Sequence, residues 1–216
     1  ISGRNGAVST SREVVNDLST AGNYPYLTTA EILKVSSDNA ADTGTEVTSG
    51  TATGGTVYEL DDTAVDFTAI GVVVGDFLIN TSACTMSTIT AVAATKLTVD
   101  AMRTNGDKVA NVAGDTYRVA RPASTGAAVI MFIGLDENWE DLRCHVILNG
   151  INPVDLPVSM IRIFKLVVHT AGSSGGNVGE ITLTNNAGTA DMAKILPTIN
   201  ESLMAQYTVP AGKEAY

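Results

Sequence analysis

Residues Ala127–Gly150 read AAVIMFIGLDENWEDLRCHVILNG, and they form the centre of the predicted fold. Its first part, Ala127–Ile133, is an almost unbroken apolar run. Its last part alternates between two faces: Leu142, Cys144, Val146 and Leu148 lie on one, and Arg143, His145 and Ile147 on the other. A period of two residues is typical of a β-strand. With the polar segment GLDENWED between the two parts, the stretch predicts two antiparallel strands joined by a short loop.

The segments on either side of this hairpin also have strand patterns. Glu31–Val35 predicts a first strand, and Ile151–Pro157, with two prolines, predicts an edge or a connector. Met160–His169 is the strongest single strand, and its apolar phase switches near Phe164 and Lys165, which predicts a bulge. Two more strands are expected at Gly179–Thr184 and Leu203–Val209. About six mostly antiparallel strands favour a β-sandwich.

Residues 46–124 have a different sequence pattern, in which short strand patterns recur at intervals of about ten residues. The expected strands are Thr56–Leu60, Gly71–Val74, Asp76–Asn80, Met86–Val92, Lys96–Asp100 and Thr116–Ala120. Similar turn sequences, DTGT and STGA, flank this block. The sequence therefore predicts an all-β fold: an antiparallel sandwich formed by residues 1–45 and 125–216, with a small β-barrel-like domain, residues 46–124, inserted in a loop.

Composition excludes several classes of partner. The formal net charge is −10, and binding to a phosphate backbone requires an excess of Lys and Arg. No apolar run reaches the length of a membrane span, so neither nucleic acid nor a membrane is predicted as a partner. Cys84 and Cys144 do not form a disulfide framework or a metal-ligand spacing, and we interpret each as a small buried apolar residue.

The candidate chemical groups do not form a recognisable site. Two acidic clusters could supply oxygen ligands to Ca²⁺, but neither has the spacing of a calcium loop, so we interpret both as solvated turns. The clusters are Asp61, Asp62 and Asp66, and Asp136, Glu137, Asn138, Glu140 and Asp141. His145 and His169 are interpreted as core or sheet-surface residues. Ser173 and Ser174 lack both a nucleophile frame and a phosphate cradle.

No catalytic, cofactor-binding or metal-binding residue is therefore predicted, and the chain is not expected to be an enzyme. A glycosidase would require two carboxylates about 5–9 Å apart, a pairing that Asp136 and Glu140 could mimic. Trp139, the one tryptophan, lies at the tip of the central hairpin. It either anchors a protein or sugar partner, or folds back over the edge of the sheet.

Several segments, taken as a set, resemble a family of virion structural proteins encoded by marine tailed bacteriophages. They are ISGRN, AEILKVSS, AADTGT, IGLDENWED with VILNG, AGSSGGNVGEITLTN and LMAQYTVPAGKEAY. The resemblance covers most of residues 1–45 and 126–216. Members typically pass directly from the AADTGT turn to the strand before GLDENW, which favours the insertion. They also continue beyond the VPAGK turn, which implies a longer chain.

The resemblance implies a component of the virion, assembled in the host cytoplasm, that acts through protein–protein interfaces as a capsid decoration or particle-surface protein. The outer domain would bind other capsid or tail proteins and copies of itself, and residues 46–124 would be displayed. The interface candidates are Trp139, Arg4, Asn5, Tyr24 and Tyr26. The alternative is a receptor- or glycan-binding module of a tail or fibre, using Trp139 or the strands of Tyr58 and Tyr117 to bind a host-surface glycan.

Overall fold

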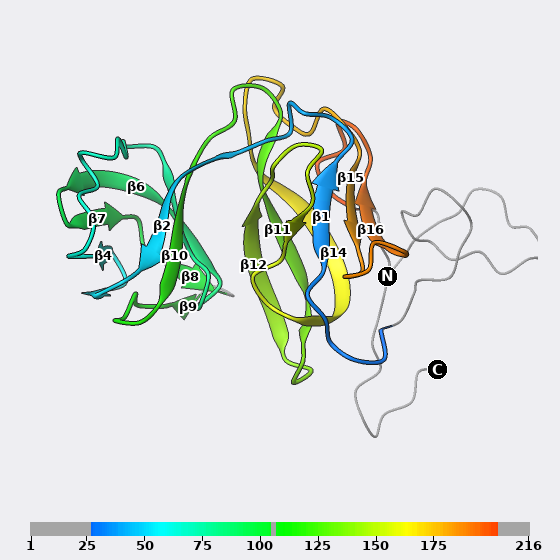
Figure 1. The fold of residues 1–216 in the computed structure, drawn as a ribbon, viewed down its shortest axis with the longest axis horizontal. Coiled ribbons are helices and arrows are strands. Elements are labelled where there is room, and N and C mark those ends of the chain that lie inside the picture. Colours follow the sequence, from blue (N-terminus) through cyan, green and yellow to red (C-terminus); the bar gives the residue numbers. More distant parts are fainter. Residues whose placement is uncertain (1–26, 105–106, 203–216) are drawn as a thin grey trace, which may run out of the picture.

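The computed structural model describes residues 27–104 and 107–202. The regular secondary structure in these residues consists of β-strands alone. The all-β prediction is confirmed. The outer part consists of two antiparallel sheets (Figure 1). One has the order β13 (Val154–Asp155), β1 (Lys34–Ser37), β15 (Ile181–Thr184), β16 (Asp191–Ile195). The other has the order β12 (Asp141–Ile147), β11 (Ala127–Asp136), β14 (Met160–Ala171).

The two outer sheets bury one hydrophobic core between them, as in a sandwich. One sheet contributes Val35, Ile181, Leu183, Met192 and Ile195; the other contributes Ile130, Phe132, Val146, Ile163 and Leu166. Of the two alternating faces of Leu142–Leu148, the one with Leu142, Cys144, Val146 and Leu148 packs in this core. The predicted edge segment contains β13, which pairs with β1 at the border of its sheet.

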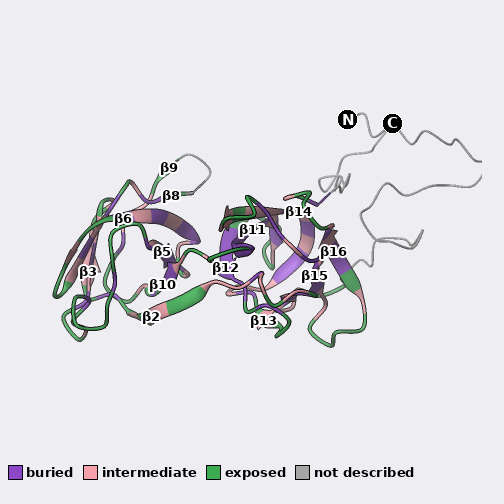
Figure 2. Cartoon of the chain, turned by 90° about the horizontal axis from the view of Figure 1, so that it is seen from above, coloured by how far each residue is buried: buried purple, intermediate pink, exposed green. Residues whose placement is uncertain are grey.

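Strand β11 is buried on both faces, and this explains its unbroken apolar sequence. Ile130 and Phe132 point into the sandwich core, whereas Ala128 and Val129 belong to a second cluster with Ile79 of the inserted part. Figure 2 shows buried residues, in purple, on β12 and β14 and also on β6 of the inserted part. Strand β11 therefore lies between two packed layers.

The bulge predicted near Phe164 is confirmed. Ile133 pairs with Lys165 and Gly134 pairs with Ile163, so Phe164 is the extra residue in β14. The backbones approach closely here, because a Cβ added to Gly134 would collide with the carbonyl oxygen of Arg162. Glycine at position 134 is what allows the bulged strand to pair.

The inserted part forms a separate seven-stranded antiparallel sheet. Its order is β2 (Thr45–Thr51), β10 (Thr116–Arg121), β5 (Phe77–Asn80), β6 (Thr85–Ala93), β7 (Lys96–Val99), β4 (Glu59–Asp61), β3 (Gly54–Gly55). A hairpin of β8 (Arg103–Thr104) and β9 (Asp107–Lys108) lies apart from it. The sheet encloses its own core, with Phe67 and Tyr117 among its largest residues. Independent folding of residues 46–124 stays a prediction.

The sheet of the inserted part is curved but open, so the expected barrel is not closed. β2 and β3 stand at the two ends of its strand order. After β2 the chain bends at Ala52, which exchanges backbone hydrogen bonds with Asp115 and Gly114, and it continues directly into β3. A two-residue strand made of glycines is too short to form the closing ladder.

Some expected elements differ from the structure. Gly71–Val74 is not a strand but part of a turn-rich connection, where Gly71 and Gly75 have positive φ of 85° and 95°. The first outer strand begins at Lys34 rather than Glu31, whose single bridge to Met160 precedes it. The expected strand Leu203–Val209 lies outside the described residues.

One buried carboxylate joins the segments where the chain enters and leaves the inserted part. Asp42 Oδ1 accepts the backbone N–H groups of Ala127 and Val178, both at 2.8 Å. Its Oδ2 accepts the Gly179 N–H and the Ser37 hydroxyl, at 2.8 and 2.7 Å. Asp42 is fully buried. These four bonds link the turn after β1, the start of β11 and the loop before β15.

Candidate interaction surface

The tip of the β11–β12 hairpin is held by its own hydrogen bonds. Asp136 Oδ1 accepts the N–H groups of Asn138 and Glu140, at 2.8 and 2.9 Å. Trp139 adopts a positive φ of 64° and is 51% exposed. The Arg162 guanidinium lies 5.0 Å from the centre of its ring. Trp139 is therefore both exposed and stacked, with a cation on its ring and much of its surface open to a partner.

The other acidic cluster is only in part the solvated turn that was predicted, because Asp61 lies in β4 beside Lys96 and Asp62 is buried. Asp62 accepts the hydroxyl of buried Tyr117 at 2.7 Å. Asp66 caps the next turn, and hydrogen bonds from Thr68 and then Ala69 lower the pKa of its carboxyl. Within residues 27–104 and 107–202, no three His, Cys, Asp or Glu side chains are grouped so that they could hold a metal ion.

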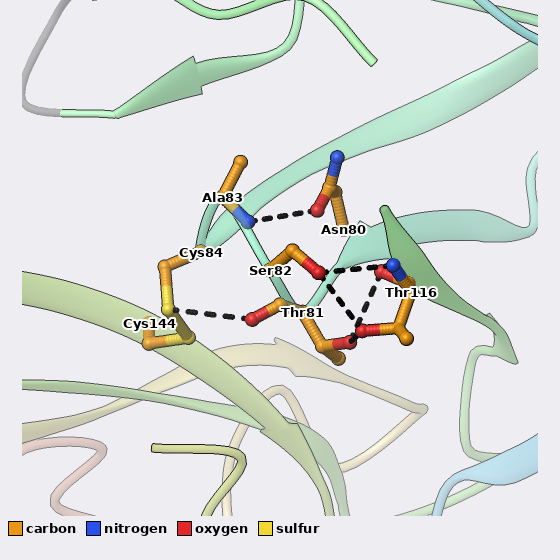
Figure 3. The surroundings of a disulfide bond; sticks show 7 residues. All are labelled: Asn80, Thr81, Ser82, Ala83, Cys84, Thr116 and Cys144. Carbon is orange, nitrogen blue, oxygen red and sulfur yellow. Dashed lines mark hydrogen bonds between the residues drawn. A yellow bond between two sulfur atoms is a disulfide. The ribbon is translucent and has the colours of Figure 1, made fainter. Parts of the chain in front are cut away.

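The two cysteines form a disulfide, and the interpretation of them as unpaired apolar residues is wrong. Cys84 precedes β6 of the inserted part and Cys144 lies in β12 of the sandwich, 60 residues later (Figure 3). Nothing in that spacing indicates that the two residues are neighbours. The bond arises because the start of β6 packs over β12. It ties the inserted sheet covalently to the sandwich.

A groove of about 310 Å³ runs beside the disulfide. The turn before β6, the hairpin tip and the segment before β14 form its walls. The lining residues are Ser82, Ala83, Cys84, Asp136, Glu137, Leu142, Val158 and Ser159. The groove therefore brings Cys84, two carboxylates and two aliphatic side chains together at the boundary between the inserted part and the sandwich.

His145 and His169 lie at the same boundary, with ring centres 4.7 Å apart. His145 is buried, and neither of its ring nitrogens has a hydrogen-bond partner among the described residues. Burial, with a further contribution from His169, lowers the pKa of the His145 imidazole to about 3. Partial burial also lowers the pKa of His169. The prediction of core or sheet-surface histidines agrees with these positions.

The neutral His145 predicts acid sensitivity. An unfolded histidine takes up a proton near pH 6.5, and folded His145 does so only near pH 3. Its stabilising effect is complete above pH 6.5 and is lost as the pH falls toward 3, by up to about 1.4 kcal/mol per pH unit. Between pH 7.5 and 4.5, the free energy of unfolding of the wild type should fall by roughly 2–3 kcal/mol more than that of His145→Phe. Urea denaturation at both pH values measures this difference.

His169→Phe is the matched control for that experiment, because His169 is the exposed member of the pair. This variant should keep most of the wild-type loss of stability at pH 4.5. If His145→Phe lost stability in parallel with the wild type, then burial of a neutral imidazole would not be the source of acid sensitivity.

An apolar loop, defined as Ile70–Val74, is exposed on the inserted part between β4 and β5. Ile70, Val73 and Val74 are 43%, 51% and 64% exposed, whereas Val72 is buried in the core of the inserted sheet. Isolated exposed apolar residues are common, but three on one short loop form a patch that favours contact with another protein. A strand was predicted here, so sequence reasoning missed this surface.

Hydrogen bonds fix the shape of the apolar loop. Arg121 donates to both carboxylate oxygens of buried Asp76, at 2.9 and 2.8 Å, and to the carbonyl of Gly71 at 2.7 Å. Asp76 also accepts the N–H of Val73 at 3.0 Å. A loop held in this way loses little conformational entropy when it binds a partner.

Of the five predicted interface residues, the described part of the chain contains only Trp139. Trp139 lies at the hairpin tip, and Arg4, Asn5, Tyr24 and Tyr26 lie outside the described residues. Of the other aromatic candidates, Tyr58 is partly exposed, with the Lys108 ammonium near its ring. Tyr117 is buried and bonded to Asp62, so it cannot contact a glycan.

The fold and surface define an all-β sandwich with an attached β-sheet, presenting an apolar loop and a tryptophan-bearing hairpin. Comparisons of the chain with models of protein families, with curated proteins and with solved structures find no match. In the part of the chain that the structure describes, no helix has the length and apolar character needed to cross a membrane.

Proposed function

We propose that this protein is a structural component of a tailed-bacteriophage particle, a capsid decoration or particle-surface protein that acts through protein–protein interfaces. The observation that carries this proposal is the exposed apolar loop, Ile70–Val74, held rigid by Arg121 and Asp76. A fixed apolar patch on a β-sheet scaffold suits docking onto another folded protein. Because the loop belongs to the inserted part, that part makes contacts in this proposal and is not merely displayed.

The segments behind the resemblance to phage structural proteins give further support. AADTGT contains Asp42, and AGSSGGNVGEITLTN contains Val178 and Gly179, which donate to the Asp42 carboxylate. AEILKVSS ends at Ser37, whose hydroxyl also donates to the Asp42 carboxylate. Three of the signature segments thus meet at one buried group. In this proposal, the signature segments form the framework of the sandwich and have no chemical role.

Durability supports the proposal in a second way. A particle component must keep its shape outside the cell, where no chaperone can refold it. The disulfide joins the inserted sheet to the sandwich, and extracellular conditions maintain such bonds. The buried cluster of Ile79, Ala120, Ala128, Val129 and Ile147 fixes the same boundary without covalent bonds.

The test uses particles from the phage genome that encodes this chain, prepared with its gene deleted. Purified wild-type protein should bind these particles saturably. Val74→Asn should weaken binding about tenfold, because it replaces the most exposed apolar side chain of the loop. The matched control is Val112→Asn, which alters a similarly exposed valine of the inserted part and should bind like the wild type.

Failure of the wild type to bind any gene-deleted particle would contradict the proposed function. Equal binding by Val74→Asn and the wild type would contradict the assignment of the contact to the apolar loop.

Trp139 favours a second candidate, a receptor- or glycan-binding module. Its ring is half exposed beside a groove that contains the carboxylates of Asp136 and Glu137, and an aromatic face with nearby oxygen acceptors suits a sugar. This candidate differs from the first because it requires the isolated chain to bind host-surface polysaccharide when no particle is present.

A further inference from the structure

We infer that the groove beside Cys84 is a thiol–disulfide exchange site, in which a small neutral or cationic thiol attacks Cys84 and opens the link between the inserted sheet and the sandwich. This inference does not depend on the proposed function. It follows from the unequal surroundings of the two sulfur atoms, the rigid turn that carries Cys84, and the charge of the groove.

The two cysteines differ in access. Cys84 lines the groove of about 310 Å³ and keeps 4% of its surface exposed. Both cysteines belong to the sandwich core cluster, but Cys144 is fully buried and is not among the residues that line this groove. Exchange requires an approaching thiolate to reach one sulfur of the bond. Cys84 is therefore the sulfur attacked, and Cys144 is the leaving group.

Hydrogen bonds hold the turn that carries Cys84 in addition to the disulfide (Figure 3). Asn80 Oδ1 accepts the Ala83 N–H at 2.8 Å, and Ser82 Oγ accepts the Thr116 N–H at 2.9 Å. Cys84 itself adopts a positive φ of 52°, a conformation that a non-glycine residue keeps only when its surroundings impose it. These contacts should hold the Cys84 sulfur near Cys144 after the bond is cleaved, which makes the exchange reversible.

The chemistry balances as two successive displacements. The thiolate of the small thiol attacks Cys84 Sγ, the bond between the two cysteines breaks, and its electron pair goes to Cys144 Sγ, which then takes up a proton. The products are a mixed disulfide at Cys84 and a free Cys144 thiol. A second small thiol then attacks the sulfur of the first small thiol in the mixed disulfide. This step releases the disulfide of the two small thiols and leaves the Cys84 thiol, which takes up a proton. Two small thiols are oxidised as the protein disulfide is reduced.

Charge determines which thiols react fastest. Asp136 and Glu137 line the same groove as Cys84, and the chain as a whole carries a net charge of −10. An anionic thiol is repelled as it approaches, whereas a cationic thiol is attracted. The site therefore favours cationic and neutral thiols over anionic ones such as glutathione. This selection would preserve the link in a medium whose main thiol is anionic.

The test treats the folded protein with 2-aminoethanethiol, 2-mercaptoethanol or 2-mercaptoethanesulfonate, which are cationic, neutral and anionic. Each rate is divided by the rate of the same thiol with bis(2-hydroxyethyl) disulfide. The cationic thiol should exceed the anionic thiol by at least about fivefold at low salt, and the ratio should approach one at 1 M salt. Acid quenching, alkylation and peptide mass spectrometry should find the mixed disulfide on Cys84 and the alkyl group on Cys144.

Two carboxylate variants test the origin of the selectivity. Glu137→Gln should reduce the ratio of cationic to anionic rates by about twofold. Glu140→Gln is the matched control, because it removes an exposed charge from the same hairpin tip but not from the groove, and it should leave the ratio nearly unchanged.

Three results would overturn the inference. The first is a mixed disulfide on Cys144. The second is a reduction rate that does not change with thiol concentration, since the bond would then react only after the protein unfolds. The third is an equal normalised rate for all three thiols at low salt.

Discussion

Replacing both Cys84 and Cys144 by alanine is expected to lower the free energy of unfolding by about 3–4 kcal/mol. The disulfide spans 60 residues, and closure of a loop of this length restricts the unfolded chain by about 4 kcal/mol at 25 °C. The native state loses little else, because the buried cluster around Val129 and Ile147 still packs the inserted sheet against the sandwich. Urea denaturation of the oxidised proteins measures the difference.

Reducing agent supplies the control for this experiment. Full reduction of the wild type should lower its stability to nearly that of the double alanine variant, and the variant itself should not respond. A double variant within about 1 kcal/mol of the oxidised wild type would show that the disulfide does not constrain the unfolded chain as described.

Asp42→Ala is expected to cost about 3–5 kcal/mol, a loss comparable with or larger than that of the disulfide. The substitution removes the common acceptor of three backbone N–H groups and the Ser37 hydroxyl, all at 2.7–2.8 Å. Donors left without an acceptor in a buried site carry their full desolvation cost. Circular dichroism during urea denaturation should show an early loss of the sandwich.

Asp38→Ala provides the matched control in the same turn. Asp38 is exposed and its carboxylate accepts one backbone N–H, from Glu180 at 2.8 Å. We expect this variant to lose only about 0.5–1.5 kcal/mol. Similar losses from both variants would contradict the role of Asp42 as the group that joins the turn, β11 and the loop before β15.

The sandwich could be predicted from sequence because its strands have periodic or continuous apolar patterns. The apolar run Ala127–Ile133 indicates a strand, and the phase switch in Met160–His169 locates the bulge at Phe164. These signals are local, since they arise from side chains that alternate along one strand. β2 was missed, because its sequence TEVTSGT has little apolar alternation and its strand lies at the edge of a sheet.

The links between distant segments could not be predicted, because they depend on tertiary packing. Cys84 and Cys144 meet only when β6 lies over β12, and the four donors to Asp42 come from three separate segments. Ile70–Val74 resembled a strand because valines favour strands. Two glycines with positive φ, Gly71 and Gly75, turn it into a loop, and its apolar side chains become surface.

For the candidate surface, the sequence indicated Trp139 at the hairpin tip but not its stacking with Arg162, which lies in β14. The apolar loop had no sequence signal that distinguishes it from a strand. A contact surface is defined by what the fold leaves uncovered, and burial depends on residues far away in the chain.

The most direct test of the proposed virion role is quantitative mass spectrometry of phage particles purified from a lysate in which this chain is expressed. We expect peptides from both the sandwich and residues 46–124, in a fixed ratio to the major capsid protein and resistant to washing in high salt. Absence of these peptides from particles, when the infected lysate contains them, would contradict a virion role.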